Sequence, residues 1–414
     1  MIANLMLDKV RSSSSTPGDR GFFDGKPTRK TQTEHFKAID GLRAYMAWWV
    51  VCQHLLQASG IIKIYDYPVL KLLTMGGLAV MVFVIISGFV IAHLLLTSEE
   101  NYGEYIVRRF FRIYPIYLVA ILLALALREQ YYTFIASAPW AAPSAQVAFM
   151  EQQQELPVHI ALHVTLLHGL VPNAVLPHSV EAILAPAWSL SLEWQFYLLA
   201  PLFVSALFQR GRAAQIAVFV LALIAMSATY AMNPASQWQF PAFLPLTIGF
   251  FAAGIMTRFL FGGVPRGMLV LPAILAGLNF AFYAAVSDYG SVLLPFLPLA
   301  IWFVVAIFCY RRISDLNSPL DRLFALVLES RAIVNMGRWS YSTYLLHGPI
   351  FLVAFAAMHA LGISMTEHAA FLALLLACPV IVVLSWASYR LIEAPGNTIG
   401  RNLSRRLRKP APAS

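Results

Sequence analysis

Long apolar segments alternate with short polar connections along almost the whole chain. Each segment is close to the ~20 residues that a helix needs to cross a bilayer. The pattern therefore predicts an all-α, polytopic membrane protein with about ten transmembrane helices. The predicted spans are residues 38–57, 70–97, 105–127, 187–208, 213–232, 240–261, 268–286, 291–310, 338–361 and 369–392.

The polar stretches divide the chain into three parts. Residues 1–36 are polar and include a run of four serines, which predicts a disordered tail. Residues 37–396 form the predicted ten-helix transmembrane domain, and residues 397–414 a basic tail. Within the domain, residues 128–186 are mostly too polar to span, although 158–171 predict a short helix that lies at the membrane surface or re-enters it.

The composition excludes a soluble enzyme. Hydrophobic residues make up 59% of the 414 residues and charged residues 12%, against roughly 45–50% and ~25% in soluble domains. A soluble fold of this size could not bury so much apolar surface. The three cysteines form no disulfide or zinc pattern.

Basic residues predict the orientation. The net charge is +9, but the 29 lysines and arginines cluster in alternate connections, and none occurs between Arg128 and Arg210. Because cytoplasmic loops carry the excess of basic residues, both termini are predicted to be cytoplasmic and 128–186 to face outside. The charge therefore indicates membrane topology and anionic lipid contact, and we expect no nucleic-acid partner.

Ionisable residues inside spans are costly and are candidates for function. Arg43 and His54 are eleven residues apart in the first span, so they share a helix face and lie about 16 Å apart along its axis. Glu193 lies about two turns into its span from the outside, at a depth similar to that of His54. This arrangement predicts that Glu193 orients His54 as a base. The alternatives are snorkelling of Arg43, an interfacial His54 and a structural bond at Glu193.

Two further spans carry polar candidates. His347 lies near mid-membrane, and Tyr344 shares its helix face at a spacing of three residues. Hydrogen bonding between helices is the alternative function of this pair. Ser87 and Gly88 place two small residues in the second span, where they allow close helix approach or access to the backbone.

A cluster of arginines opens the third span. Arg108, Arg109 and Arg112 have the spacing that predicts one helix face, and guanidinium groups suit phosphates. Ordinary anchoring on the cytoplasmic side is the alternative. His159 and His163 are four residues apart in the outer segment, but no carboxylate or cysteine completes a ligand set, so we predict no metal site.

Six motifs together resemble acyltransferase family 3, the bacterial inner-membrane O-acyltransferases that modify surface glycans and related acceptors. They occur in the family's order between residues 36 and 396. The motifs are Arg-x10-His at 43–54, Phe-x-x-Ser-Gly-Phe within 83–89, Arg-Arg-x-x-Arg-Ile-x-Pro at 108–115, Trp-Ser-Leu-x-x-Glu-x-x-Phe-Tyr at 188–197, Ser-Tyr-x-x-Tyr-x-x-His at 340–347 and Ile-Glu-x-Pro at 392–395.

The resemblance implies a cytoplasmic acyl-CoA donor, with acetyl-CoA favoured, and no permanently bound cofactor. Residue by residue, it implies that His54 is catalytic, with Glu193 and Arg43 as partners, and that Arg109 and Arg112 bind the donor. We expect the donor site to include also Arg108, Ser87, Tyr344 and His347.

The resemblance further implies an O-acyltransferase in the bacterial inner membrane. Its acceptor is expected to be a hydroxyl of a carbohydrate or glycolipid, such as lipopolysaccharide O-antigen or exopolysaccharide. His54 acts either as a base for direct transfer or as an acyl carrier. The rival hypothesis is a multi-pass transporter that uses the buried Arg, His and Glu as a proton relay.

Overall fold

Helices are the only regular elements in the described part of the chain, as predicted. The structure, a computed structural model, describes residues 37–61, 67–98, 100–208, 211–232, 234–262, 266–287, 293–313 and 318–407. The tail predicted at 1–36 lies outside the described residues, as does the end of the predicted basic tail.

Every predicted span contains a long helix. The ten helices, in chain order, are α3 (Lys37–Ser59), α5 (Gly76–Thr97), α6 (Tyr102–Ala126), α10 (Trp188–Phe208), α11 (Arg212–Ala231), α13 (Leu244–Phe261), α14 (Val270–Val286), α15 (Leu297–Ile313), α18 (Ser340–Ala360) and α19 (Glu367–Ser388). Within the described residues, eight helices are long and apolar enough to cross a membrane. The two long helices outside that set, α3 and α10, carry polar site residues. This is a multi-pass membrane protein, while the count of ten and the orientation stay predictions.

The second span begins later than predicted. Residues 68–74 form the short helix α4 (Pro68–Lys71) and a 3₁₀ turn (Leu72–Thr74), and Met75 leaves the helical conformation before α5 starts. The apolar pattern does not distinguish this turn from the helix that follows.

Helix α5 is the centre of the fold. It is apolar on all faces, buried along most of its length, and packed against α3, α10, α13 and α15. A Cβ atom on Gly88 would lie 2.2 Å from the Phe251 carbonyl oxygen, and one on Gly254 2.0 Å from the Ile85 carbonyl oxygen. The close crossing of α5 and α13 therefore requires both glycines, which confirms the close approach predicted at Ser87–Gly88.

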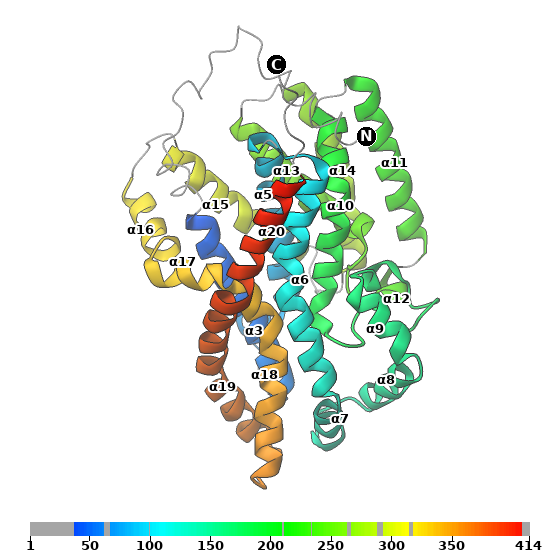
Figure 1. Cartoon of the computed structure of the whole chain (residues 1–414), viewed down its shortest axis with the longest axis vertical. Helices are drawn as coiled ribbons and strands as arrows, with labels where there is room; N and C mark the ends of the chain where they lie inside the picture. The colour runs from blue at the N-terminus through cyan, green and yellow to red at the C-terminus, as the bar shows by residue number, and fades with distance from the viewer. Residues whose placement is uncertain are drawn as a thin grey trace.

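The chain does not become a tail at residue 396. After α19 a π-helical turn (Tyr389–Glu393) leads into α20 (Ala394–Arg406), which lies along α6 (Figure 1). Gly396 packs on Pro115, and Gly400 on Phe111. Because small residues at this spacing form a flat face, α20 docks as part of the domain, and the predicted boundary falls inside this helix.

The predicted outer segment forms a small helical layer at the end of α6 that lies away from α20 (Figure 1). It contains α7 (Arg128–Ser137), α8 (Pro143–Gln154) and α9 (Leu156–Val164), and a 3₁₀ turn (His168–Leu170). Thus the short helix predicted at 158–171 ends seven residues earlier. Tyr117 donates a hydrogen bond to the His163 carbonyl oxygen at 2.8 Å and fastens α9 to α6.

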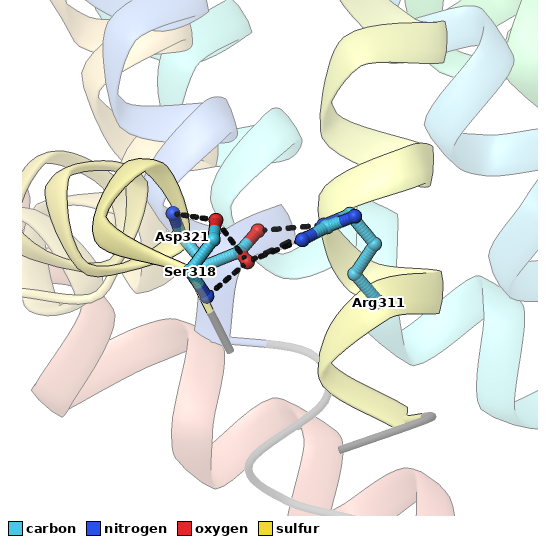
Figure 2. Close-up of polar contacts among 3 residues, drawn as sticks. All are labelled: Arg311, Ser318 and Asp321. Atoms are coloured by element: carbon cyan, nitrogen blue, oxygen red, sulfur yellow. Dashed lines mark hydrogen bonds and ion pairs between the residues drawn. The ribbon is translucent and has the colours of Figure 1, made fainter. Parts of the chain in front are cut away.

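A polar link joins α15 to the connection before α18. This connection holds α16 (Pro319–Leu328) and α17 (Arg331–Arg338). Figure 2 shows Arg311 of α15 donating hydrogen bonds to both carboxylate oxygens of Asp321, the shortest to each oxygen being 3.0 and 2.9 Å. Asp321 also forms a capping box with Ser318 at the start of α16. The arginine and the serine hydrogen bonds hold the pKa of Asp321 below its usual range.

Candidate active site

One cavity of about 300 Å³ brings together six of the nine predicted site residues. Helices α3, α5, α6, α10 and α18 form most of its wall, with one residue each from α13 and α20. The predicted residues on its surface are Arg43, Ser87, Arg109, Arg112, Glu193 and Tyr344. His54, His347 and Arg108 do not line it.

Glu193 is held by two hydroxyl groups in the cavity wall. Ser87 of α5 donates to one carboxylate oxygen at 3.0 Å, and Tyr197, one turn further along α10, donates a short hydrogen bond to the same oxygen. The small residues at the α5–α13 crossing place Ser87 at this position. Glu193 is therefore a fixed acceptor on the cavity surface.

Arg43 and Arg109 are cations without a carboxylate partner among the described residues. Arg109 lies close to the rings of Tyr105 and Tyr197, with its guanidinium carbon 6.0 and 5.7 Å from the ring centroids. Its buried Nε has no hydrogen-bond partner in the described part of the chain. A buried donor left without a partner is unfavourable, so an anionic ligand in the cavity would stabilise this group.

Arg112 is anchored differently. It forms an ion pair with Glu393 at 3.2 Å, and its guanidinium carbon lies 5.6 Å from the Tyr341 ring centroid. Ser342 donates a short hydrogen bond to the other oxygen of Glu393. Three arginines line the cavity against one lining carboxylate, Glu193. This excess of positive charge suits a phosphate-bearing ligand.

Arg108 lies apart from the other two arginines of its motif, outside the cavity lining. It forms an ion pair with Glu100, just before α6, and does not line the cavity. Arg108 and Arg109 are consecutive, so they diverge by about 100° around the helix. Glu100 holds the arginine that points away from Arg109.

His54 and His347 form a direct pair that the sequence analysis did not predict. His54 Nδ1 lies 2.7 Å from His347 Nε2, where α3 packs against α18. His347 is fully buried and His54 half-buried. The predicted pairing of His54 with Glu193 is wrong: within the described residues, Glu193 accepts from Ser87 and Tyr197, and no hydrogen bond joins it to His54.

The hydrogen bonds define the proton positions in the pair. His347 Nδ1 lies 3.2 Å from the Thr343 carbonyl oxygen, which can only accept, so Nδ1 carries the hydrogen. In a neutral ring Nε2 then accepts, and His54 Nδ1–H donates to it. No carboxylate bonds to either ring in the described part of the chain, which favours neutral rings. His54 Nε2 therefore keeps a free lone pair.

Tyr344 connects the histidine pair to the cavity. Its hydroxyl donates to the Pro186 carbonyl oxygen at 2.7 Å and lies 2.9 Å from Ser189 Oγ. Its ring centroid lies 6.3 Å from that of His347. Since Tyr344 also lines the cavity, a ligand that passes this side chain approaches the two histidines.

Four residues at the site were missed as candidates. Tyr197, Tyr341 and Glu393 lie inside the motifs at 188–197, 340–347 and 392–395, so the motifs carried a signal for them. Asn397 lines the cavity from α20 and has no such signal. Among the described residues, no group of three or more His, Cys, Asp or Glu could hold a metal ion.

A family model and two relatives match this chain. A family model for the acyltransferase domain matches residues 36–390, which include all nine predicted site residues. The chain is 26% identical over 333 residues to acyltransferase MdmB of Streptomyces mycarofaciens, covering 75% of this chain and 77% of that protein. It is 28% identical over 209 residues to protein 2 in the picA locus of Rhizobium radiobacter, covering 50% of this chain and 97% of that protein. No solved structure matches this chain.

Proposed function

Since this chain belongs to acyltransferase family 3 and is an enzyme that transfers acyl groups, we propose that acyl-CoA on the cytoplasmic side is its donor and a carbohydrate hydroxyl its acceptor. Acetyl is the proposed acyl group, and lipopolysaccharide O-antigen or exopolysaccharide the proposed acceptor class. The proposed location is the bacterial inner membrane. The observation that carries the proposal is an arginine-rich cavity separated from a histidine pair by one tyrosine.

The donor is proposed to enter with its phosphates at the arginines. Arg109 and Arg112 bind the pyrophosphate, and Arg43, which lines the same cavity from α3, binds a phosphate or the polar arm. His54 is eleven residues further along α3 than Arg43, about 16 Å along the helix axis. An extended pantetheine arm can cover this distance, so phosphates near Arg43 and a thioester near His54 are compatible in one bound molecule.

The chemistry is proposed to start at His54 Nε2. This nitrogen accepts the proton of the acceptor hydroxyl, and the oxygen attacks the thioester carbon. When the tetrahedral intermediate collapses, the carbon–sulfur bond breaks and the CoA thiolate takes the proton from the imidazolium. An ester and free CoA result. His347 accepts the Nδ1–H bond of His54 throughout and so keeps Nε2 directed at the substrate. In the relay alternative, Nε2 itself carries the acyl group.

Glu193 is proposed to shape the cavity and not to orient His54. Its carboxylate holds the hydroxyls of Ser87 and Tyr197 and offsets part of the arginine charge. Glu193 therefore reduces the excess of buried positive charge in the empty cavity, and the remaining excess is available to an anionic donor.

The test of the donor site is a steady-state measurement with purified protein in nanodiscs. Arg109→Ala is the chosen variant because Arg109 has no carboxylate partner, whereas Arg112→Ala would leave Glu393 buried and uncompensated. We expect Arg109→Ala to raise the KM for acetyl-CoA about tenfold or more, since charged hydrogen bonds contribute about 1.5–3 kcal/mol. Arg112→Lys should raise it less, because lysine keeps the charge but loses the bidentate geometry.

The control is Arg322→Ala, an exposed arginine of α16 that is remote from the cavity lining. Equal KM values in Arg109→Ala and Arg322→Ala would contradict the donor site. Transfer that stops when no membrane gradient is present would favour the transporter hypothesis, and transfer in nanodiscs without a gradient excludes it.

A further inference from the structure

Helix α20 carries a row of residues that leads out of the cavity. Asn397 lines the cavity, and Arg401 and Arg405 follow at spacings of four. Residues four apart lie on neighbouring positions of one helix face, so the two guanidinium groups continue the line that Asn397 begins. Both arginines are exposed.

The docking of α20 on α6 brings this row to the start of α6. Gly396 packs on Pro115, and Gly400 on Phe111, so the two helices run antiparallel (Figure 1). Four residues further along α20, the same register reaches the turn of α6 that contains Arg108. The charges of Arg401 and Arg405 act on Arg108 accordingly.

The resulting cluster has more positive than negative charge. Glu100 is the single carboxylate that pairs with Arg108 in the described part of the chain. Arg401 has a hydrogen bond to the neutral Thr398 at 3.0 Å. Three guanidinium groups that share one carboxylate repel one another, and a phosphate between them would remove this repulsion.

The cavity also leaves part of the proposed donor outside. Its volume of about 300 Å³ is at the lower end of the range for drug-sized ligands, and coenzyme A is larger than such ligands. With the thioester near His54 and the pyrophosphate at Arg109 and Arg112, the nucleotide extends beyond the cavity. The nucleotide carries a phosphate monoester, with a charge of about −1.5 to −2 at neutral pH.

We propose that Arg401 and Arg405, together with Arg108, form a second phosphate subsite that binds the 3′-phosphate of coenzyme A. This inference rests on the proposed acyl-CoA donor. In this proposal α20 recognises the nucleotide end of the donor, whereas Arg109 and Arg112 bind the pyrophosphate.

The experiment compares two donors that differ only in this phosphate, acetyl-CoA and acetyl-3′-dephospho-CoA. In wild-type protein in zwitterionic nanodiscs, we expect the KM for the dephospho donor to be about five- to thirtyfold higher, the range that two to three exposed charge contacts produce. In Arg401→Ala/Arg405→Ala, the KM for acetyl-CoA should rise to a similar value. The KM for the dephospho donor should stay within about twofold.

Arg406→Ala is the matched control. It removes one arginine from the same helix, against two in the double variant, and position 406 is about 180° around the helix from Asn397. Thermal unfolding checks that both variants are folded, and the wild-type comparison of the two donors needs no variant at all.

Three results would overturn the inference. The first is equal KM values for the two donors in wild-type protein. The second is an equal loss in Arg406→Ala and in the double variant. The third is an effect of the double variant that appears with both donors and only in anionic nanodiscs, which would assign the arginines to lipid headgroups. If wild-type protein transfers from neither donor, the proposed donor itself is wrong. Normal transfer without discrimination contradicts the second subsite alone.

Discussion

Replacing His347 tests the hydrogen-bond chain that defines the proton positions at His54. In His347→Ala, His54 Nδ1–H loses the acceptor that now lies 2.7 Å away. A donor left unsatisfied in a buried site costs about 1–3 kcal/mol. His54 can avoid this cost by moving its hydrogen to Nε2, the nitrogen that the mechanism needs free.

The magnitude follows from this tautomer balance. A preference of about 1–3 kcal/mol for the wrong tautomer reduces the competent fraction about five- to 150-fold, since 1.36 kcal/mol is a factor of ten. We therefore expect kcat of His347→Ala to fall by this factor. The KM for acetyl-CoA should change little, because His347 does not line the donor cavity.

His347→Gln is the conservative variant. A glutamine amide offers both an acceptor for His54 and a donor for the Thr343 carbonyl oxygen, so we expect it to recover part of the lost rate. His359→Ala is the matched control, because it removes an exposed histidine from the same helix α18. The assay is release of CoA thiol coupled to acetyl transfer, with kcat and KM determined for each variant.

Two outcomes would refute this reasoning. One is a kcat in His347→Ala within about twofold of His359→Ala, below the smallest loss expected from the buried donor. The other is a glutamine variant no faster than the alanine variant, which would show that the hydrogen-bond acceptor is not what His347 contributes.

Three further predictions address other parts of the fold. Glu193→Gln keeps an acceptor for its two hydroxyl partners, so transfer rates of purified variants should show a smaller loss than in His54→Ala. A larger loss would assign the function of the base to Glu193. Gly88→Ala places a Cβ 2.2 Å from a carbonyl oxygen and should destabilise the protein by about 1–3 kcal/mol. Thermal unfolding in detergent measures this loss, and an unchanged Tm would contradict the close crossing of α5 and α13. Burial lowers the pKa of His168, in the segment between α6 and α10, to about 4. The unfolded state, in which the pKa of this histidine is ~6.5, therefore binds more protons between these values. His168 alone should lower the free energy of unfolding by up to about 1.4 kcal/mol per pH unit as pH drops from 6.5 towards 4, whereas a flat Tm over this range would contradict the burial.

Local sequence patterns predicted the helices because a helix that spans the bilayer needs an apolar run of matching length, and such a run is visible in the sequence. The boundaries moved where backbone geometry intervened, as at Met75, or where small residues allowed further docking, as at Gly396 and Gly400. Neither effect changes the hydropathy pattern enough to be predicted.

The side-chain pairs at the site depend on packing between distant segments. His54 and His347 are 293 residues apart. Predicted depth in the membrane was equally compatible with Glu193 as the partner of His54. Arg108 and Arg109 share a motif but point to different surroundings. Motif membership thus identified which residues gather near the cavity, and only the helix contacts showed which of them bond.

The central claim is that the His54 imidazole performs acyl transfer next to the arginine-lined cavity. The most direct measurement is acetyl transfer from acetyl-CoA by wild-type and His54→Ala protein, purified in nanodiscs without a gradient and matched for thermal stability. The account predicts that wild-type protein transfers and that His54→Ala loses about 10²-fold or more, as the loss of a general base requires. A variant that keeps more than about a tenth of the wild-type rate would contradict it.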